Sequence, residues 1–225
     1  MACERELPWR DRTASCCAAC WSALPKITGA KCVSCAQPLP VDTTRNSQLA
    51  TVCIRCLGDP LPLAWCEAWG EYRGSLEKLV GALKFERHDF LDDALAALLE
   101  DTLRDRGDLA FDAIAPVPMS RKKERRRGYN QAELLSRALS LRVGVRCDMT
   151  LLTRREERAT QSTLPKRERA ANVRGAFAAS SRVKGKSILV VDDICTTAET
   201  LRACATALGR AGAARVCAIT VARAS

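Results

Sequence analysis

Apolar residues recur at helical spacing in three segments between residues 74 and 141. The segments are GSLEKLVGALKF at 74–85, FLDDALAALLEDTL at 90–103 and QAELLSRALSL at 131–141. In each of them, leucines and other apolar residues stand three or four positions apart, which places them on one face of a helix. We therefore expect three amphipathic helices that pack on a larger layer.

Short, continuous apolar runs predict the strands of that layer. FDAIAPVP at 111–118 reads as a strand that ends at Pro116, followed by a basic loop at 120–131. SILVVDD at 187–193 is typical of a strand buried on both faces. A helix at 197–212 and the strand ARVCAITVA at 214–222 follow it, which completes a βαβ unit. The order predicts an α/β fold with a doubly wound, mainly parallel sheet.

The cysteines divide the chain into two parts. Nine of the 13 cysteines lie in the first 66 residues. The predicted domains are therefore a cysteine module at 1–66 and an α/β domain at 67–225. We expect Cys195 and the isolated Cys66, Cys147, Cys204 and Cys217 to have no chemical role.

Four of these cysteines have the spacing of a zinc site. Cys32 and Cys35 form one C-x2-C pair, Cys53 and Cys56 form another, and 17 residues separate the pairs. Four thiolates on two such turns satisfy tetrahedral Zn²⁺ and stabilise a segment that has little core of its own. The alternative is a set of reduced, buried cysteines.

A second metal site would need a less regular set. Cys17 and Cys20 form a third pair, but only Cys3 and the adjacent Cys16 are available to complete it. Either this second ribbon is degenerate, or the chain starts downstream of the true start.

Charge and the N-terminus narrow the function classes. The net charge is +10, which favours partners rich in phosphate, either nucleic acid or a small diphosphate. The N-terminal residues are polar and charged, and no run of apolar residues is long enough to cross a membrane. We expect a cytoplasmic protein with reduced thiols.

The run VVDDICTTAETL carries the clearest chemistry. Asp192 and Asp193 end the predicted strand, and a hydroxyl-rich turn leads into a helix. Carboxylates accept hydrogen bonds from vicinal hydroxyls, and the free N–H groups of a helix N-terminus bind phosphate. A phosphorylated ribose is the implied ligand, although a buried strand followed by a simple N-cap is the structural alternative. The predicted binding residues are Asp192, Asp193, Thr196, Thr197, Ala198, Glu199 and Thr200.

This run resembles the type I phosphoribosyltransferases. The resemblance implies that the site binds 5-phosphoribosyl diphosphate together with Mg²⁺. The chain departs from the family pattern after the two threonines, where glycine is common and Ala198 and Glu199 stand instead. The methyl group of Ala198 and the negative charge of Glu199 both bear on how tightly the loop would bind phosphate.

Two further segments extend the resemblance to the ComF family. They are APVPMSRKKERRRGYNQAELL and TQSTLPKRERAANVRGAF, which contain a PVP strand end, an R-G-aromatic-N-Q turn and a later T-Q…R…N…AF pattern. Arginine forks match phosphate oxygens, so Arg121, Arg125 and Arg127 are candidates for binding the diphosphate or a nucleic-acid backbone. Lys84 is a further candidate, with an ordinary surface lysine as its alternative.

The ComF resemblance implies three functional classes. One is a phosphoribosyltransferase whose acceptor the sequence does not identify. Another is a protein that binds single-stranded DNA during natural transformation and acts beside a helicase-like partner. The third is an adaptor that senses nucleotide status. A retained pocket does not by itself establish turnover, because this fold also serves proteins without catalytic activity.

Overall fold

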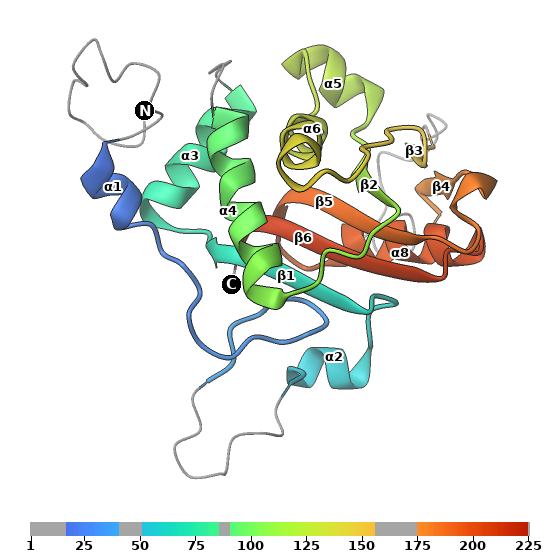
Figure 1. Cartoon of the computed structure of the whole chain (residues 1–225), viewed down its shortest axis with the longest axis horizontal. Helices are drawn as coiled ribbons and strands as arrows, with labels where there is room; N and C mark the ends of the chain where they lie inside the picture. The colour runs from blue at the N-terminus through green and yellow to red at the C-terminus, as the bar shows by residue number, and fades with distance from the viewer. Residues whose placement is uncertain (1–16, 41–50, 86–90, 156–174, 225) are drawn as a thin grey trace, which may run out of the picture.

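A four-stranded parallel sheet is the centre of the molecule (Figure 1). The computed structural model describes residues 17–40, 51–85, 91–155 and 175–224. The strand order is β1-β6-β5-β2, and every neighbouring pair is parallel. The strands are β1 (Trp65–Glu71), β6 (Arg215–Arg223), β5 (Ser187–Cys195) and β2 (Ala113–Pro116). The predicted α/β fold class is confirmed.

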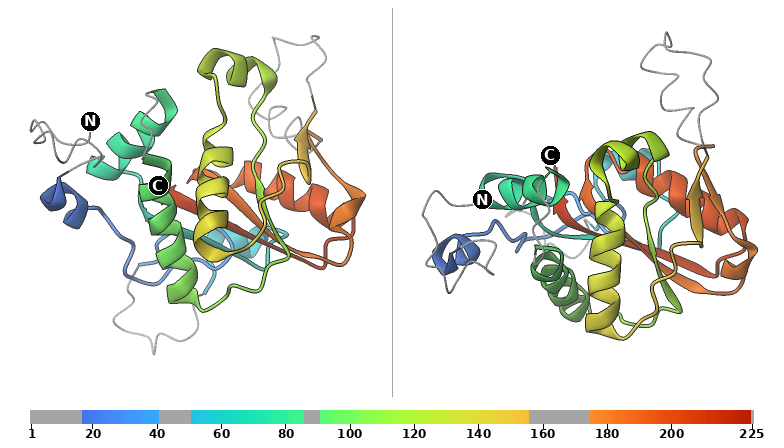
Figure 2. Two further views of the ribbon diagram at one scale, coloured as in Figure 1. Left: turned by 45° about the horizontal axis from the view of Figure 1, so that its top comes forward. Right: turned by 90° about the horizontal axis from the view of Figure 1, so that it is seen from above.

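Helices cover both faces of the sheet (Figure 2). On one face α4 (Leu91–Arg106) and α6 (Gln131–Val143) pack side by side, and α3 (Gly74–Phe85) contributes to the same core. On the other face lie α8 (Glu199–Arg210) and the short antiparallel hairpin of β3 (Leu152–Arg154) and β4 (Phe177–Ala179). The three helices predicted at 74–85, 90–103 and 131–141 are therefore confirmed.

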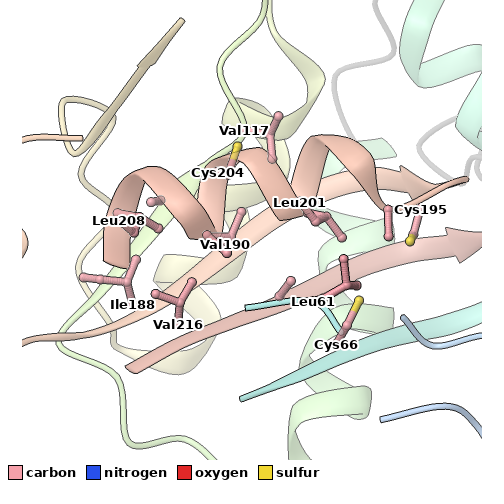
Figure 3. Packing of buried hydrophobic residues seen from close by; sticks show 14 of the residues in the cluster. Leu61, Cys66, Val117, Ile188, Val190, Cys195, Leu201, Cys204, Leu208 and Val216 are labelled. Carbon is pink, nitrogen blue, oxygen red and sulfur yellow. The ribbon is translucent and has the colours of Figure 1, made fainter. Parts of the chain in front are cut away.

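The α8 face has a closely packed apolar core (Figure 3). Leu201 and Leu208 of α8 are buried against Val190 of β5 and Val216 of β6. Full burial of a leucine contributes about 1.5–3 kcal/mol. This core fixes α8, and thus its N-terminus, relative to the end of β5.

The free edge of β1 is covered by the N-terminal segment. The Ile27 amide donates to the Trp69 carbonyl at 3.0 Å, the Glu71 amide donates to the Pro25 carbonyl at 2.8 Å, and the Cys66 amide donates to the Val33 carbonyl at 2.7 Å. These bonds satisfy backbone groups that an exposed edge strand would present to other chains. The cysteine module is therefore built onto the sheet edge.

Two local features differ from the sequence-based expectation. The basic segment after β2 forms a short helix, α5 (Arg121–Arg127), instead of a loop. Ser120 caps its first turn, and Gly128, at φ 85°, ends it in the left-handed conformation. Strand β5 continues past Asp193 to Cys195 because it remains paired with β6.

The remaining helices of the described residues are short. They are α1 (Ala18–Ser22), α2 (Ile54–Gly58) and the 3-10 turn η2 (Ser181–Val183). Within the described residues, no helix is both long enough and apolar enough to cross a membrane.

Candidate functional site: a cysteine cluster beside the loop after β5

The four cysteines of the two C-x2-C pairs converge. The Sγ atoms of Cys32, Cys35, Cys53 and Cys56 all lie within 4.8 Å of one another. Cys35 Sγ and Cys53 Sγ are 3.8 Å apart. Zn–S bonds of about 2.3 Å in a tetrahedron imply S···S separations of about 3.8 Å. The donor set therefore fits a tetrahedral, thiophilic metal ion.

The electrostatics of the cluster favour a thiolate at one of its members. Burial acts to raise the pKa of Cys53, but hydrogen bonds from the Cys56 amide and from the neighbouring thiols lower this pKa to about 7. Burial raises the pKa of Cys35. A metal ion would replace the remaining protons, because thiolates are its ligands.

The other candidate metal ligands lie elsewhere. Cys20 is part of α1 and Cys17 precedes its first residue, and neither belongs to the four-cysteine group. Cys3 and Cys16 lie outside the described residues. In the part of the chain that the structure describes, one group of metal-ligating side chains is formed.

The acidic pair lies where β5 leaves the core of the sheet. The Asp193 amide donates to Asp192 Oδ1 at 2.9 Å, and Lys84 Nζ lies 3.2 Å from Asp193 Oδ2. Lys84 belongs to α3 and also faces the Tyr72 ring, whose centroid is 5.9 Å from Nζ. The structure thus brings Lys84 to the acidic pair, which the helical pattern alone does not indicate.

The carboxyl group of Asp192 is held in an unfavourable environment for charge. Burial raises its pKa well above the ordinary value, and the carboxylate of Asp193 raises it further. Two neighbouring carboxylates with one adjacent lysine form a site that a hydroxyl donor or a divalent cation would stabilise.

The loop after β5 presents an uncapped helix N-terminus. Thr196 and Thr197 are exposed, and Ala198 is the N-cap of α8 without any side-chain capping bond. Ala198 has φ 60° and ψ 6°, which is the left-handed conformation that favours glycine. The first amides of α8 therefore have no side-chain cap, as an anion site at a helix N-terminus requires.

Two arginines hold the carboxylate of Glu199. Arg55 Nη2 lies 2.8 Å from Glu199 Oε1, and Arg202 Nε lies 3.5 Å from Oε2. The negative charge that departs from the family pattern is thus paired with two positive charges.

The R-G-aromatic-N-Q turn joins three parts of the fold. The Tyr129 hydroxyl donates to the Leu83 carbonyl of α3 at 2.8 Å. Asn130 caps α6 and donates to the Val117 carbonyl, after β2, at 3.0 Å. This turn orients α5, which carries Arg121, Arg125 and Arg127. The later motif residues Thr160, Gln161, Arg167 and Asn172 lie outside the described residues.

Comparison with known proteins identifies the family. The phosphoribosyl transferase domain model matches residues 91–225. "DNA utilization protein YhgH" of Escherichia coli K12 is 35% identical over 168 residues, covering 73% of this chain and 74% of the relative. "Competence protein ComFC" of Bacillus subtilis is 28% identical over 199 residues, covering 88% of this chain and 79% of the relative. The chain belongs to the ComF family of phosphoribosyltransferase-domain proteins.

Another ComF-family relative has a shorter match. "Competence protein F" of Haemophilus influenzae is 33% identical over 139 residues, covering 59% of this chain and 61% of the relative. The family resemblance stated from the two basic motifs is confirmed.

Several residues of the site carry no recognisable sequence pattern. Arg55 lies between two cysteines, Arg202 lies in α8, and Arg223 ends β6. Nothing distinguishes Arg202 and Arg223 among the 36 lysines and arginines of the chain. For Arg55, its place inside a C-x2-C pair is the one available cue.

Proposed function

We propose that this ComF-family protein binds 5-phosphoribosyl diphosphate with Mg²⁺ at the end of β5. The observation that carries the proposal is the uncapped N-terminus of α8 next to the Asp192–Asp193 pair. The helix amides and the hydroxyls of Thr196, Thr197 and Thr200 would bind the 5-phosphate. The two carboxylates would accept hydrogen bonds from the ribose hydroxyls.

The donor set fits Mg²⁺ as well as hydroxyls. Carboxylate oxygens are hard ligands, and Mg²⁺ usually reaches a protein through one or two of them together with substrate phosphates. Asp192 and Asp193 are the residues that would face it. When bound, the ion would neutralise charge on the departing diphosphate.

The diphosphate would extend from this loop towards α5. Arg121, Arg125 and Arg127 would bind its oxygens, and Lys84 would stabilise the acidic pair or the leaving group. Such a site would act by positioning and electrostatics, with developing charge stabilised by groups that are already in place. The proposal concerns the donor substrate and leaves the acceptor open.

We also propose that the four-cysteine cluster binds structural Zn²⁺. The support is the agreement between its sulfur separations and tetrahedral geometry. A second metal site formed by Cys17, Cys20 and Cys3 has no comparable support.

Calorimetric titration with 5-phosphoribosyl diphosphate and Mg²⁺ tests the proposed function. The wild-type protein should bind in a saturable manner, and the double variant Asp192→Asn/Asp193→Asn should not. Asp101→Asn, an exposed aspartate of α4, is the matched control and should bind like wild type. Absence of binding by the zinc-loaded wild type would refute the proposal.

Nucleic-acid binding by α5 is a second candidate function. Arg121, Lys122, Lys123, Arg125 and Arg126 are exposed on this helix, and one relative is named for DNA utilization. Binding through phosphates would weaken as salt rises, by about one unit of slope for each contact. Lys122→Glu/Arg126→Glu should reduce both the affinity for single strands and the salt slope. An unchanged slope would exclude α5 as the contact surface.

A further inference from the structure

The four-cysteine cluster is in direct contact with the loop at 196–198 between β5 and α8, which the proposed function makes the ribose-phosphate loop. Arg55 stands between the metal-ligand candidates Cys53 and Cys56. Its Nη2 donates to the Thr197 carbonyl at 2.5 Å and pairs with Glu199 Oε1 at 2.8 Å. Arg55, which lies inside the second C-x2-C pair, therefore holds the C-terminal end of the loop.

The first cysteine pair holds the other end. The Cys35 carbonyl accepts a hydrogen bond from Arg223 Nε at 3.0 Å and a weaker one from Cys195 Sγ at 3.7 Å. Arg223, only 5% exposed, also donates from Nη1 to the Cys195 carbonyl at 3.1 Å. Figure 3 shows Cys195 beside the first turn of α8. The start of the loop is thus tied to the Cys32–Cys35 turn.

A third contact connects the end of α2 to α8. Arg202 donates to Asp59 Oδ1 at 3.1 Å and to the Pro60 carbonyl at 2.8 Å. Arg202 also pairs with Glu199, the first residue of the helix. The segment that follows the second cysteine pair is therefore attached to the same helix N-terminus.

These contacts imply a mechanical role for a bound metal. The two cysteine pairs are separated by 17 residues, and a metal ion would join them at one point. The pair that contacts Cys195 and the pair that contacts Thr197 and Glu199 would then keep a fixed separation. The conformation of the loop between them depends on that separation.

The ion pair between Arg55 and Glu199 affects how the loop would bind phosphate. A carboxylate at the first helical position repels an incoming phosphate unless its charge is paired. Arg55 supplies one of its two partners, and the other, Arg202, is more distant at 3.5 Å. Loss of the Arg55 contact would expose this negative charge to the phosphate.

We propose that occupancy of the four-cysteine site sets the affinity of the ribose-phosphate loop, with Arg55 as the positioning residue that couples the two. The inference rests on the proposed function of the loop. Coupling between two binding sites is reciprocal. If bound metal raises the affinity for phosphoribosyl diphosphate by some factor, bound phosphoribosyl diphosphate must raise the affinity for the metal by the same factor.

The test is a pair of affinity measurements on the full-length protein. Wild type and Arg55→Ala are titrated with phosphoribosyl diphosphate and Mg²⁺, and Zn²⁺ affinity is measured by chelator competition with and without that ligand. Wild type should hold Zn²⁺ about tenfold more tightly in the presence of the ligand, within the usual range of coupling factors. Arg55→Ala should bind the ligand about tenfold more weakly and show almost no reciprocal effect.

Matched variants separate positioning from simple loss of folding. Arg104→Ala, which removes an exposed arginine paired with Glu100 on α4, should leave the coupling factor unchanged. Arg55→Lys should recover part of the ligand affinity, because it restores the charge opposite Glu199. Glu199→Gln should restore affinity in the Arg55→Ala background, because it removes the unpaired carboxylate.

Three outcomes would overturn the inference, and they are distinguishable. If wild type binds the ligand but Zn²⁺ affinity is the same with and without it, the coupling does not exist. If wild type and Arg55→Ala bind the ligand equally, Arg55 has no positioning role. If wild type does not bind the ligand, the proposed function fails first, and the coupling fails with it.

Discussion

Lys84 Nζ lies 3.2 Å from Asp193 Oδ2 and joins α3 to the end of β5. Both side chains are mostly buried, with 21% and 14% of their surfaces exposed. The pair places a cation beside two carboxylates, at the point where the family resemblance implies a sugar and a diphosphate. Lys84, which the sequence offers as a candidate with an ordinary surface lysine as the alternative, therefore lies beside the acidic pair of the candidate site.

Removal of this lysine should weaken ligand binding. Lys84→Met leaves Asp192 and Asp193 without their cation, and we expect the affinity for phosphoribosyl diphosphate with Mg²⁺ to fall about tenfold, or about 1.4 kcal/mol. Lys78→Met, at an exposed position of the same helix, is the control and should bind normally. Equal affinities of the two variants would remove Lys84 from the site.

The raised pKa of Asp192 predicts that the substitution Asp192→Asn stabilises the protein. Burial raises this pKa above the ordinary 3.8, so the folded state binds the proton more tightly than the unfolded state. The contribution of this carboxyl group to the free energy of unfolding therefore falls as pH rises through its folded pKa. Asp192→Asn should have a higher melting temperature than wild type at pH 7.5. The difference should shrink as pH falls towards 4, and a constant difference across this range would contradict the assignment.

The backbone of Ala198 predicts opposite effects for two alanine-to-glycine changes. At φ 60° an alanine is strained by about 1–2 kcal/mol relative to glycine. Ala198→Gly should therefore stabilise the protein in urea by up to about 1 kcal/mol, since the loss of a buried methyl offsets part of the gain. Ala211→Gly, at φ −81°, should destabilise it by about 0.5–1 kcal/mol. The same sign for both changes would argue against the left-handed conformation.

Gly70 predicts how strongly the N-terminal segment depends on the edge of β1. A Cβ there would lie 2.7 Å from the Pro25 carbonyl oxygen and 2.7 Å from Leu76 Cδ2. Gly70→Ala should reduce the free energy of unfolding by about 1–3 kcal/mol through overpacking. Gly81→Ala in α3 has open space around the new methyl and should be neutral or stabilising. Equal stability of the two variants would mean that residues 25–27 are not held on β1.

The strands β5 and β6 could be predicted because both are continuous apolar runs buried on two faces. Strand β1 could not, because its run contains Glu67, and the residues that make this burial tolerable are distant in sequence. Glu67 pairs with Lys31 and Arg106, from the N-terminal segment and from α4. Pairing of this kind is a tertiary property that local pattern does not reveal.

In the candidate site, too, some features follow from the local sequence and others depend on contacts between distant residues. The acidic pair and the threonines lie together in one run, so their chemistry follows from adjacency. The contacts of Arg55 with Thr197 and Glu199 join residues 142 and 144 positions apart. The sequence pattern predicts a loop at α5 because its residues RKKERRR have no apolar face. The signals that do mark this helix are its end residues, the N-cap Ser120 and the left-handed Gly128.

A crystal structure of the protein with phosphoribosyl diphosphate and Mg²⁺ tests the central claim most directly. The account predicts that the 5-phosphate contacts the amides of residues 196–200 and that the ribose hydroxyls face Asp192 and Asp193. Density for the ligand at another surface, with this loop vacant, would contradict it.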